Sequence, residues 1–302
     1  MRHRKNKLLL LKLLSLFSVV RGYNILMIVL AQYLASIYIL APSLPLREVV
    51  FDGHLFVIVL ASALVIAGGY IINNFYDAEK DLINKPTKTM LDRLVGQRIQ
   101  LTTYFILNFL SVFLASYVSF RAVLFFSAYI FGIWFYSHKL KKIAFVGNFV
   151  SATLAITPFF AVFVYYKNFE TVIFVHAMFL FLLILAREMI KDLENMAGDL
   201  VQNYKTIPVL YGIKVSKQLI TVLVTLTLVP ALLLIYTFDV GFMYLYFAGS
   251  VVFLLLFSIL LWKSDSKGHY VGLHNILKLI IICGVFSILL IDIDLVLNRI
   301  LW

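Results

Sequence analysis

The sequence contains almost no cysteine and unusually few polar residues. Cys283 is the only cysteine, which excludes an intramolecular disulfide and a cysteine-rich metal site. Hydrophobic residues make up 63% of the 302 residues, whereas apolar residues make up about 45–50% of a typical soluble domain. This composition argues against a soluble fold and indicates an all-α, polytopic membrane protein.

Patterns typical of nucleotide and histidine metal sites are also missing. The glycines in GYIINN and AGD lack the spacing of a nucleotide-binding loop, so we expect no NAD or ATP site. His54, His176 and His274 show no metal-ligand spacing. The formal net charge of +11 would favour nucleic acid as the partner of a soluble protein. In a membrane protein it is better explained by basic loops that face anionic lipid and an anionic substrate, so we expect no nucleic-acid partner.

Acidic residues gather instead at the end of an apolar run, in the sequence IINNFYDAEKDLINKP at positions 71–86. Asn73, Asp77 and Asp81 are four residues apart and so share one face of a helix, with Asn74 beside them. Oxygen ligands at the mouth of a membrane span are unfavourable unless a cation lies among them. Ligand sets made only of oxygen favour Mg²⁺. The alternative is an ordinary solvated helix end.

A second cluster, REMIKDLENMAGD at positions 187–199, repeats this arrangement after another apolar run. Asp192, Asn195 and Asp199 share a helix face there. Two carboxylate faces followed by lysines are suited to a diphosphate, because metal ions bridge carboxylate and phosphate oxygens and lysines neutralise the remaining charge. The lysines that follow the two clusters are Lys85, Lys88 and Lys205. The predicted metal ligands are Asn73, Asp77, Asp81, Asp192, Asn195 and Asp199.

The two clusters resemble the motifs of the UbiA superfamily of intramembrane prenyltransferases, N-D-x-x-D-x-x-x-D after the second helix and D-x-x-x-D after the sixth. The resemblance covers about residues 21–290. Further matching pieces are Arg21 and Asn24, YSHKLKK at 136–142 with the following Gly147 and Asn148, and KTIPVLYG at 205–212. Asn74 and Asn195 stand where the family usually has Asp. Each change removes a negative charge, which bears on the number of metals held.

The resemblance implies Mg²⁺-dependent transfer of a prenyl group from a prenyl diphosphate to a lipophilic acceptor. The carboxylates would hold the metal that stabilises the leaving diphosphate. The ring of Tyr136 would stabilise the allylic cation, unless it is an interfacial anchor of a helix end. The predicted catalytic residues are Asp77, Asp81, Asp192, Asp199 and Tyr136. The predicted substrate-binding residues are Asn24, Asn73, Asn74, Lys85, Lys88, Lys141, Lys191, Asn195 and Lys205.

Apolar runs predict about nine membrane spans around a central cavity, within a single domain over 1–302. They cover 23–41, 55–76, 99–118, 121–135, 146–166, 172–190, 215–238, 241–262 and 273–295. The polar stretches 77–97 and 191–214 are expected to cap the cavity. Residues 1–20 are expected to form a basic amphipathic segment on the inner membrane face, without signal cleavage, and the alternative is a plain basic tail.

The basic residues predict the orientation. One side of this topology receives the N-terminus, both acidic clusters and most lysines and arginines. The opposite side receives only Arg47, Arg121, Lys167 and Arg299. This asymmetry predicts a cytoplasmic N-terminus and a site open to the cytoplasm of a multi-pass protein in the cytoplasmic membrane.

The identity of the acceptor is less well defined by the sequence. DAEKDLINKP and KDLENMAGD are most similar to the superfamily branch that transfers geranylgeranyl to geranylgeranylglyceryl phosphate, although Lys85 replaces an Arg and Asn195 an Asp. A glycerol phosphate headgroup would also bring a second anion for the surplus lysines. The alternatives are a quinone-pathway aromatic prenyltransferase, a terpene cyclase on the same scaffold, and a cation channel or transporter.

Overall fold

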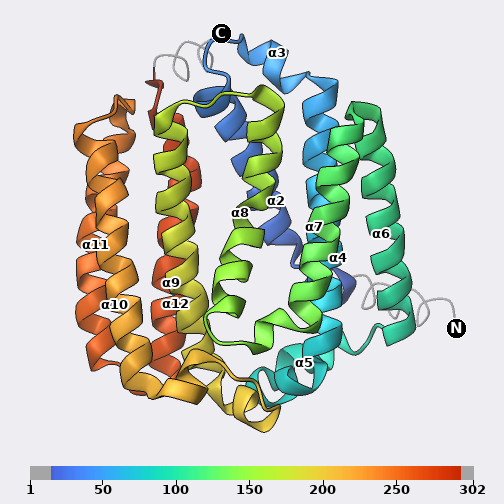
Figure 1. Cartoon of the computed structure of the whole chain (residues 1–302), viewed down its shortest axis with the longest axis vertical. Coiled ribbons are helices and arrows are strands. Elements are labelled where there is room, and N and C mark those ends of the chain that lie inside the picture. Colours follow the sequence, from blue (N-terminus) through green and yellow to red (C-terminus); the bar gives the residue numbers. More distant parts are fainter. Residues whose placement is uncertain (1–14, 294–302) are drawn as a thin grey trace, which may run out of the picture.

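The structure is a computed structural model that describes residues 15–293 (Figure 1). The predicted amphipathic segment over 1–20 lies outside the described residues as far as position 14. Between 15 and 293 the chain is helical, and its one isolated β-bridge joins Ile143 to Lys205. The all-α fold predicted from composition is confirmed.

Nine helical segments in this part of the chain are long and apolar enough to cross a membrane, as predicted. They are α2 (Gly22–Ala35) with η1 (Ser36–Leu40), α4 (Gly53–Asn84), α6 (Gln97–Val118), α7 (Phe120–His138) with η2 (Leu140–Lys142), α8 (Val146–Tyr166), α9 (Thr171–Val201), α10 (Ile207–Tyr236), α11 (Tyr244–Lys263) after η3 (Gly241–Met243), and α12 (Lys267–Ser287) with η4 (Ile288–Leu290). Two short helices, α3 (Leu46–Val50) and α5 (Pro86–Asp92), lie at opposite ends of the bundle in Figure 1.

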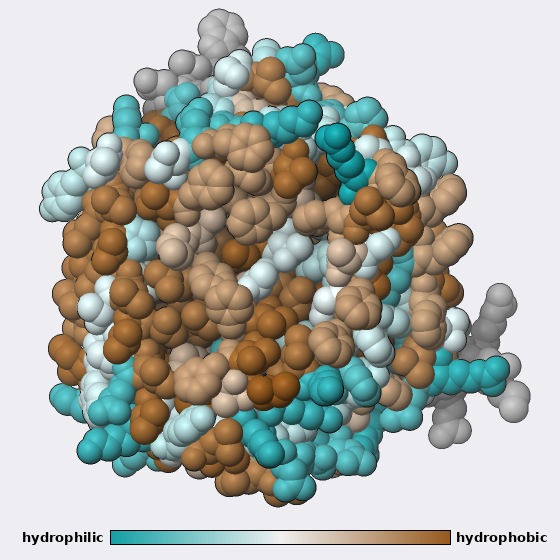
Figure 2. Space-filling model, in the orientation of Figure 1, coloured by the Kyte–Doolittle hydropathy of each residue, from teal (hydrophilic) through white to brown (hydrophobic). Residues whose placement is uncertain are grey.

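The outer surface has the pattern expected of a lipid-facing bundle. Hydrophobic side chains cover the middle of the molecule, and hydrophilic ones gather at both ends (Figure 2). Large apolar residues such as Phe105, Phe109 and Phe131 are at least 60% exposed. Exposed rings of this kind are unfavourable in water and favourable against lipid tails.

Helices α4 and α9 form the centre of the bundle. In their most apolar stretches 61% and 56% of the residues are buried, compared with 33% or less in the other seven spans. Helix α4 packs against α6 and α7, α9 packs against α10 and α12, and the two central helices also touch each other. The two acidic clusters therefore belong to the two most enclosed helices.

Both central helices continue well past the predicted ends of their spans, to Asn84 and Val201. The polar segments stay helical because their side chains find partners inside the bundle. The Asn84 side chain donates to the Asn195 carbonyl at 3.2 Å and accepts from the Gly198 amide at 3.2 Å, which clamps the end of α4 onto α9. The polar stretches 77–97 and 191–214 are expected from the sequence to cap the cavity. In the structure they form helix ends, the short helix α5 and short connections between helices.

Candidate active site

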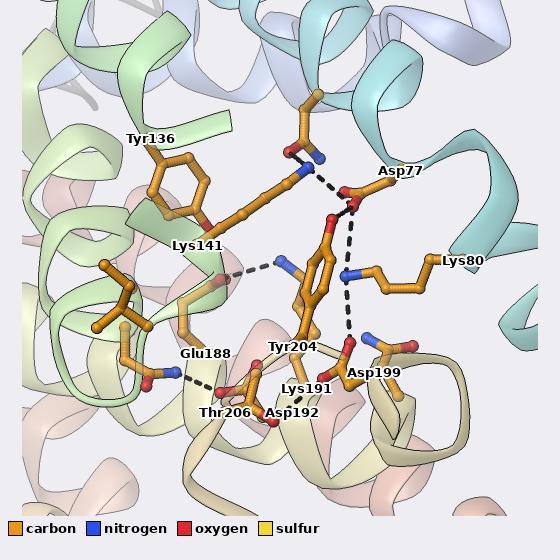
Figure 3. A pocket seen from close by; sticks show the side chains of 15 residues that line it. Asp77, Lys80, Tyr136, Lys141, Glu188, Lys191, Asp192, Asp199, Tyr204 and Thr206 are labelled. Carbon is orange, nitrogen blue, oxygen red and sulfur yellow. Dashed lines mark hydrogen bonds and ion pairs between the residues drawn. The ribbon is translucent and has the colours of Figure 1, made fainter. Parts of the chain in front are cut away.

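A small cavity lies where the polar ends of α4 and α9 meet (Figure 3). Its volume is about 40 Å³. The elements around it are α4, α7 with η2, α8, α9 and the segment that leads into α10. Its lining residues are Asn73, Asp77, Lys80, Tyr136, Lys141, Ile143, Gly147, Asn148, Glu188, Lys191, Asp192, Asn195, Asp199, Tyr204 and Thr206.

On the α4 side, Asp77 is the centre of a hydrogen-bonded network. Its side chain is nearly buried, and its Oδ1 lies 2.8 Å from Lys141 Nζ. Lys141 Nζ also donates to Asn73 Oδ1 at 3.3 Å. The Tyr204 hydroxyl donates to Asp77 Oδ1 at 3.3 Å. Burial and the charge of Asp77 raise the pKa of Tyr204, so its hydroxyl stays protonated and remains a donor.

Lys80 links the two acidic clusters. Its Nζ lies 3.4 Å from Asp77 Oδ1 and 3.3 Å from Asp199 Oδ1. The same ammonium is 4.5 Å from the centre of the Tyr204 ring, a cation–π distance. Lys80 points away from solvent and occupies the space between the carboxylates (Figure 3). It was not among the predicted site residues, although it lies one turn after Asp77.

The α9 side presents a second set of oxygens. Asp192 accepts from Asn148 Nδ2 at 2.7 Å, and Asp199 Oδ2 accepts from the Thr206 hydroxyl at 3.3 Å. Asp199 Oδ1 makes the ion pair with Lys80 but has no hydrogen-bond partner. The Oδ1 of Asn195 is buried and has no hydrogen-bond partner at all. The cavity thus holds carboxylate and amide oxygens with free bonding capacity.

Glu188 lies four residues before Asp192 on the same face of α9. Its charge interacts with that of the adjacent Arg187, but within the described residues the two side chains form no ion pair. Its Oε2 instead accepts from Ser151 Oγ at 2.9 Å and pairs with Lys191 Nζ at 3.0 Å. Glu188 is therefore part of the cavity wall and orients Lys191 toward it.

The structure brings eight of the predicted site residues to the cavity. They are Asn73, Asp77, Tyr136, Lys141, Lys191, Asp192, Asn195 and Asp199. The remaining six, which do not line it, are Asn24, Asn74, Asp81, Lys85, Lys88 and Lys205. Asp81 lies one turn past Asp77 on α4 and is half-buried.

Most of the outlying residues have other partners. Asn24 donates to the Tyr70 hydroxyl at 3.2 Å, and Asn74 donates to Gln100 Oε1 at 3.4 Å. Lys88 pairs with Asp92 at 3.3 Å, and Lys85 pairs with Glu194 at 3.6 Å. The exposed Lys205 bonds through its backbone, since its amide donates to the Lys142 carbonyl at 2.9 Å.

Sequence reasoning missed Lys80, Glu188 and Tyr204 as site residues, and noted Asn148 and Thr206 only as part of the family resemblance. The helical spacing of Lys80 from Asp77 and of Glu188 from Asp192 was a usable signal. Tyr204 and Thr206 flank the predicted Lys205, but nothing in the sequence shows that the connection folds back over α4.

The donor set fits Mg²⁺ shared with a phosphate group. In residues 15–293 no three His, Cys, Asp or Glu side chains converge on a point that could hold a metal ion. Mg²⁺ usually takes one or two carboxylates and completes its octahedron with water and substrate phosphates. The unpartnered Asn195 oxygen and the nearby carboxylates of Asp192 and Asp199 supply that partial set.

A volume of about 40 Å³ is far below the roughly 300–1,000 Å³ of a typical small-molecule site. The lysine side chains of Lys80 and Lys141 fill the remaining space by pairing with Asp77. A group as large as a diphosphate would fit only with these ion pairs separated. Once separated, the same ammonium groups are free to bind phosphate oxygens.

Residues 29–271 match the sequence model of the UbiA prenyltransferase family. The chain belongs to this family. The resemblance inferred from the motifs is therefore confirmed, and with it the assignment as a prenyltransferase enzyme.

Similar UbiA proteins come from archaea. A digeranylgeranylglyceryl phosphate synthase of Thermococcus sibiricus is 30% identical over 225 residues, which cover 74% of this chain and 79% of that protein. The protein of the same name from Saccharolobus solfataricus is 29% identical over 240 residues, covering 77% and 84%.

Solved UbiA structures share the fold. One concerned with digeranylgeranylglyceryl phosphate synthase in membranes has a TM-score of 0.69 at 22% identity, covering 92% of this chain and 97% of that one. A UbiA homolog from Archaeoglobus fulgidus bound to GPP and Mg²⁺ has a TM-score of 0.67 at 14% identity, covering 91% and 99%. The helical membrane fold is thus that of UbiA proteins.

Proposed function

We propose that this prenyltransferase moves a geranylgeranyl group from its diphosphate to a glyceryl phosphate lipid, with Mg²⁺ as cofactor. The observation that carries the proposal is the convergence of the acidic faces of α4 and α9, with Lys141, on one cavity. The names of the archaeal relatives support the glyceryl phosphate acceptor. The GPP and Mg²⁺ held by the Archaeoglobus fulgidus homolog support the donor class and the metal.

The oxygens proposed to hold Mg²⁺ come from both central helices. Those on the cavity are Asn73, Asp77, Asp192, Asn195 and Asp199, and Asp81 remains a predicted ligand one turn beyond Asp77. When bound, Mg²⁺ neutralises the negative charge that develops on the leaving diphosphate. The ammonium groups of Lys141, Lys191 and Lys80 bind the remaining phosphate oxygens, and each such bond strengthens as the leaving group becomes more negative.

The allylic end of the donor needs a dry, electron-rich surface. Tyr136 lines the cavity, and its ring can stabilise a developing cation through its quadrupole. The surrounding helices exclude water, which would otherwise capture the cation. The acceptor hydroxyl then forms the new C–O bond as the C–O bond to the diphosphate breaks, and it loses its proton to an oxygen of the departing diphosphate.

We also propose that the cavity end of the bundle faces the cytoplasm. The described basic residues at the opposite end are Arg47, Arg121 and Lys167, whereas the cavity end carries most of the others. Loops rich in lysine and arginine stay on the cytoplasmic side of a membrane. Mg²⁺ and soluble diphosphates would then reach the cavity from that side.

Product analysis tests the function. Purified protein receives geranylgeranyl diphosphate and Mg²⁺ with geranylgeranylglyceryl phosphate, with 4-hydroxybenzoate, or with no acceptor. We expect a prenylated lipid only in the first case. Prenylation of the aromatic acid alone would overturn the ether-lipid acceptor and leave prenyl transfer standing. A cyclic product without acceptor would indicate a terpene cyclase, and ion flux without diphosphate release would indicate a channel.

A further inference from the structure

A group of basic side chains lies beside the cavity, on the neighbouring face of α9. We call Arg21, Lys85, Arg187, Lys191 and His274 the basic cluster. Arg187 and Lys191 are four residues apart on α9, so they share a face. That face is rotated by about 100° from the face of Glu188 and Asp192, since an α-helix turns once in 3.6 residues. Arg21 precedes α2, Lys85 ends α4, and His274 lies on α12.

Glu194 contacts both Lys85 and His274, which places these two side chains next to each other, and charge interactions extend the group. The charges of Arg21 and Arg187 act on Lys191, and those of Arg187, Lys191 and Lys85 act on His274. Burial lowers the pKa of Lys85, and the charges of Lys191 and Arg21 add to this shift while Glu194 opposes it. Three segments, which carry Arg21, Lys85, and Arg187 with Lys191, thus direct positive charge into one small region, which is stable only with anions nearby.

The neighbouring carboxylates form ion pairs with only some members of the basic cluster. Glu188 pairs with Lys191 at 3.0 Å. Glu194 lies 3.6 Å from Lys85 and 3.5 Å from His274. Asp81 acts on Lys85 only from a greater distance.

The two guanidinium groups make no direct contact with a carboxylate, although the charge of Arg187 acts on Glu188 from a greater distance. Within residues 15–293, neither Arg21 nor Arg187 forms an ion pair with a carboxylate. The Nε of Arg187 is buried and has no hydrogen-bond partner. Arg21 lies over the Tyr70 ring at 5.0 Å and has a left-handed backbone with φ 50°. A non-glycine residue in that conformation is strained, and such strain gathers at ligand-binding positions.

We propose that the basic cluster is the subsite for the phosphate of the acceptor lipid. This inference rests on the proposed function, because it assigns the headgroup of the same acceptor. A phosphate monoester carries a charge of about −1.5 to −2 at neutral pH, which matches two guanidinium groups that lack carboxylate partners. Arginine binds phosphate through two parallel N–H bonds, which fixes the headgroup as well as attracting it.

The position of the cluster also suits the reaction. Lys191 belongs to the cluster and lines the cavity, so the two anion sites share a wall. The acceptor hydroxyl is separated from its phosphate by the short glycerol backbone. A phosphate held by Arg187 and Arg21 therefore keeps that hydroxyl next to the cavity in which the donor diphosphate binds. Lys85 is thereby assigned to the acceptor phosphate and not to the diphosphate.

The test measures binding without turnover. Detergent-purified protein in EDTA is titrated with geranylgeranylglyceryl phosphate, with the same lipid lacking its phosphate, and with inorganic phosphate. The variants are Arg187→Gln and Lys85→Gln, and the matched control is Lys214→Gln, an exposed lysine on α10 at the same end of the bundle. Loss of a charged hydrogen bond to phosphate should weaken binding of the phosphorylated lipid about tenfold or more. The dephosphorylated lipid should bind equally to all four proteins.

Several outcomes would overturn the inference. The first is equal binding of the phosphorylated and dephosphorylated lipids by the wild type. The second is an unchanged affinity of both variants for the phosphorylated lipid. The third is a loss of affinity for geranylgeranyl diphosphate in the variants that is as large as their loss for the phosphorylated lipid. Arg187 is partly buried. If Arg187→Gln melts at a lower temperature than the wild type, the lipid affinity of Lys85→Gln decides, because Lys85 is partly exposed. Binding of the phosphorylated lipid without transfer in Mg²⁺ would refute the proposed function and leave the subsite in place. Binding of inorganic phosphate as strong as that of the lipid would show a general anion site.

Discussion

The ammonium of Lys80 lies 3.3 Å from Asp199 Oδ1 and joins the acidic end of α4 to that of α9. The same group lies 3.4 Å from Asp77 Oδ1 on its own helix. Two buried carboxylates that face each other repel unless a cation lies between them. Lys80 supplies that cation and holds the two central helices together at the cavity.

Replacing Lys80 by methionine should therefore make stability depend on metal. We expect Lys80→Met to lose about 3 kcal/mol in EDTA, because removing one partner of a buried ion pair leaves the others unpaired. Mg²⁺ should raise the melting temperature of this variant more than that of the wild type, since the ion takes the place of the lysine. Thermal melts in detergent with and without Mg²⁺ measure both effects.

The control for this experiment is Lys80→Arg, which keeps the charge and should respond to Mg²⁺ nearly as the wild type does. If Lys80→Met is as stable as the wild type in EDTA, the contacts of Lys80 contribute nothing to the ligand-free protein.

Asp77 and Asp199 are expected to be essential for turnover. Both are buried, with 6% and 1% of their surfaces exposed. Asp77→Asn and Asp199→Asn keep the volume and remove the charge, so they are better tests than truncation. We expect diphosphate release to fall by a factor of roughly 10² or more, as for the loss of an electrostatic group at a transition state.

A diphosphate-release assay alongside a melt separates chemistry from folding in these variants. Asp265→Asn is the matched control, because its side chain is 85% exposed at the start of α12. Wild-type turnover in Asp77→Asn would remove the metal-site argument.

Gly198 is predicted to be indispensable for the contact between α4 and α9. A Cβ at this position would overlap the Asn84 side chain, which is held by bonds to the Asn195 carbonyl and the Gly198 amide. Because Asn84 cannot move without breaking both bonds, Gly198→Ala should cost about 1–3 kcal/mol of stability. Turnover should fall with it.

Gly249 offers the opposite case for comparison. It lies in the middle of α11, and a Cβ there meets nothing within 4 Å. Gly249→Ala should therefore be neutral or stabilise the protein by roughly 0.5–1 kcal/mol. Equal melting temperatures of the two alanine variants would contradict the proposed role of the Asn84 clamp.

The topology predicts which side of the membrane each loop reaches. In a Cys283→Ser background, which removes the exposed native thiol, single cysteines replace Thr87 on α5 and Glu170 before α9. A membrane-impermeant maleimide should label Thr87→Cys only from the cytoplasmic side and Glu170→Cys only from the other. Labelling of both from one side would be incompatible with the arrangement of the nine spans.

The membrane fold was largely predictable because span length and apolar composition are properties of local sequence. The ends of α4 and α9 were not, since their continuation to Asn84 and Val201 depends on partners distant in the chain. The same holds for the site. Helical spacing predicted that Asp77 shares a helix face with Asn73, and that Asp192 shares a helix face with Asp199. It could not show that Lys85 turns to Glu194 or that Tyr204 reaches across to Asp77.

The backbone bond from the Lys205 amide to the Lys142 carbonyl has a consequence for how the site opens. It ties the turn that carries Lys141 to the segment that carries Tyr204, and both side chains bind the same oxygen of Asp77. The Asn84 clamp fixes the opposite wall of the cavity. Moving either segment alone would break this bond, so displacement of Lys141 from Asp77 is coupled to displacement of Tyr204.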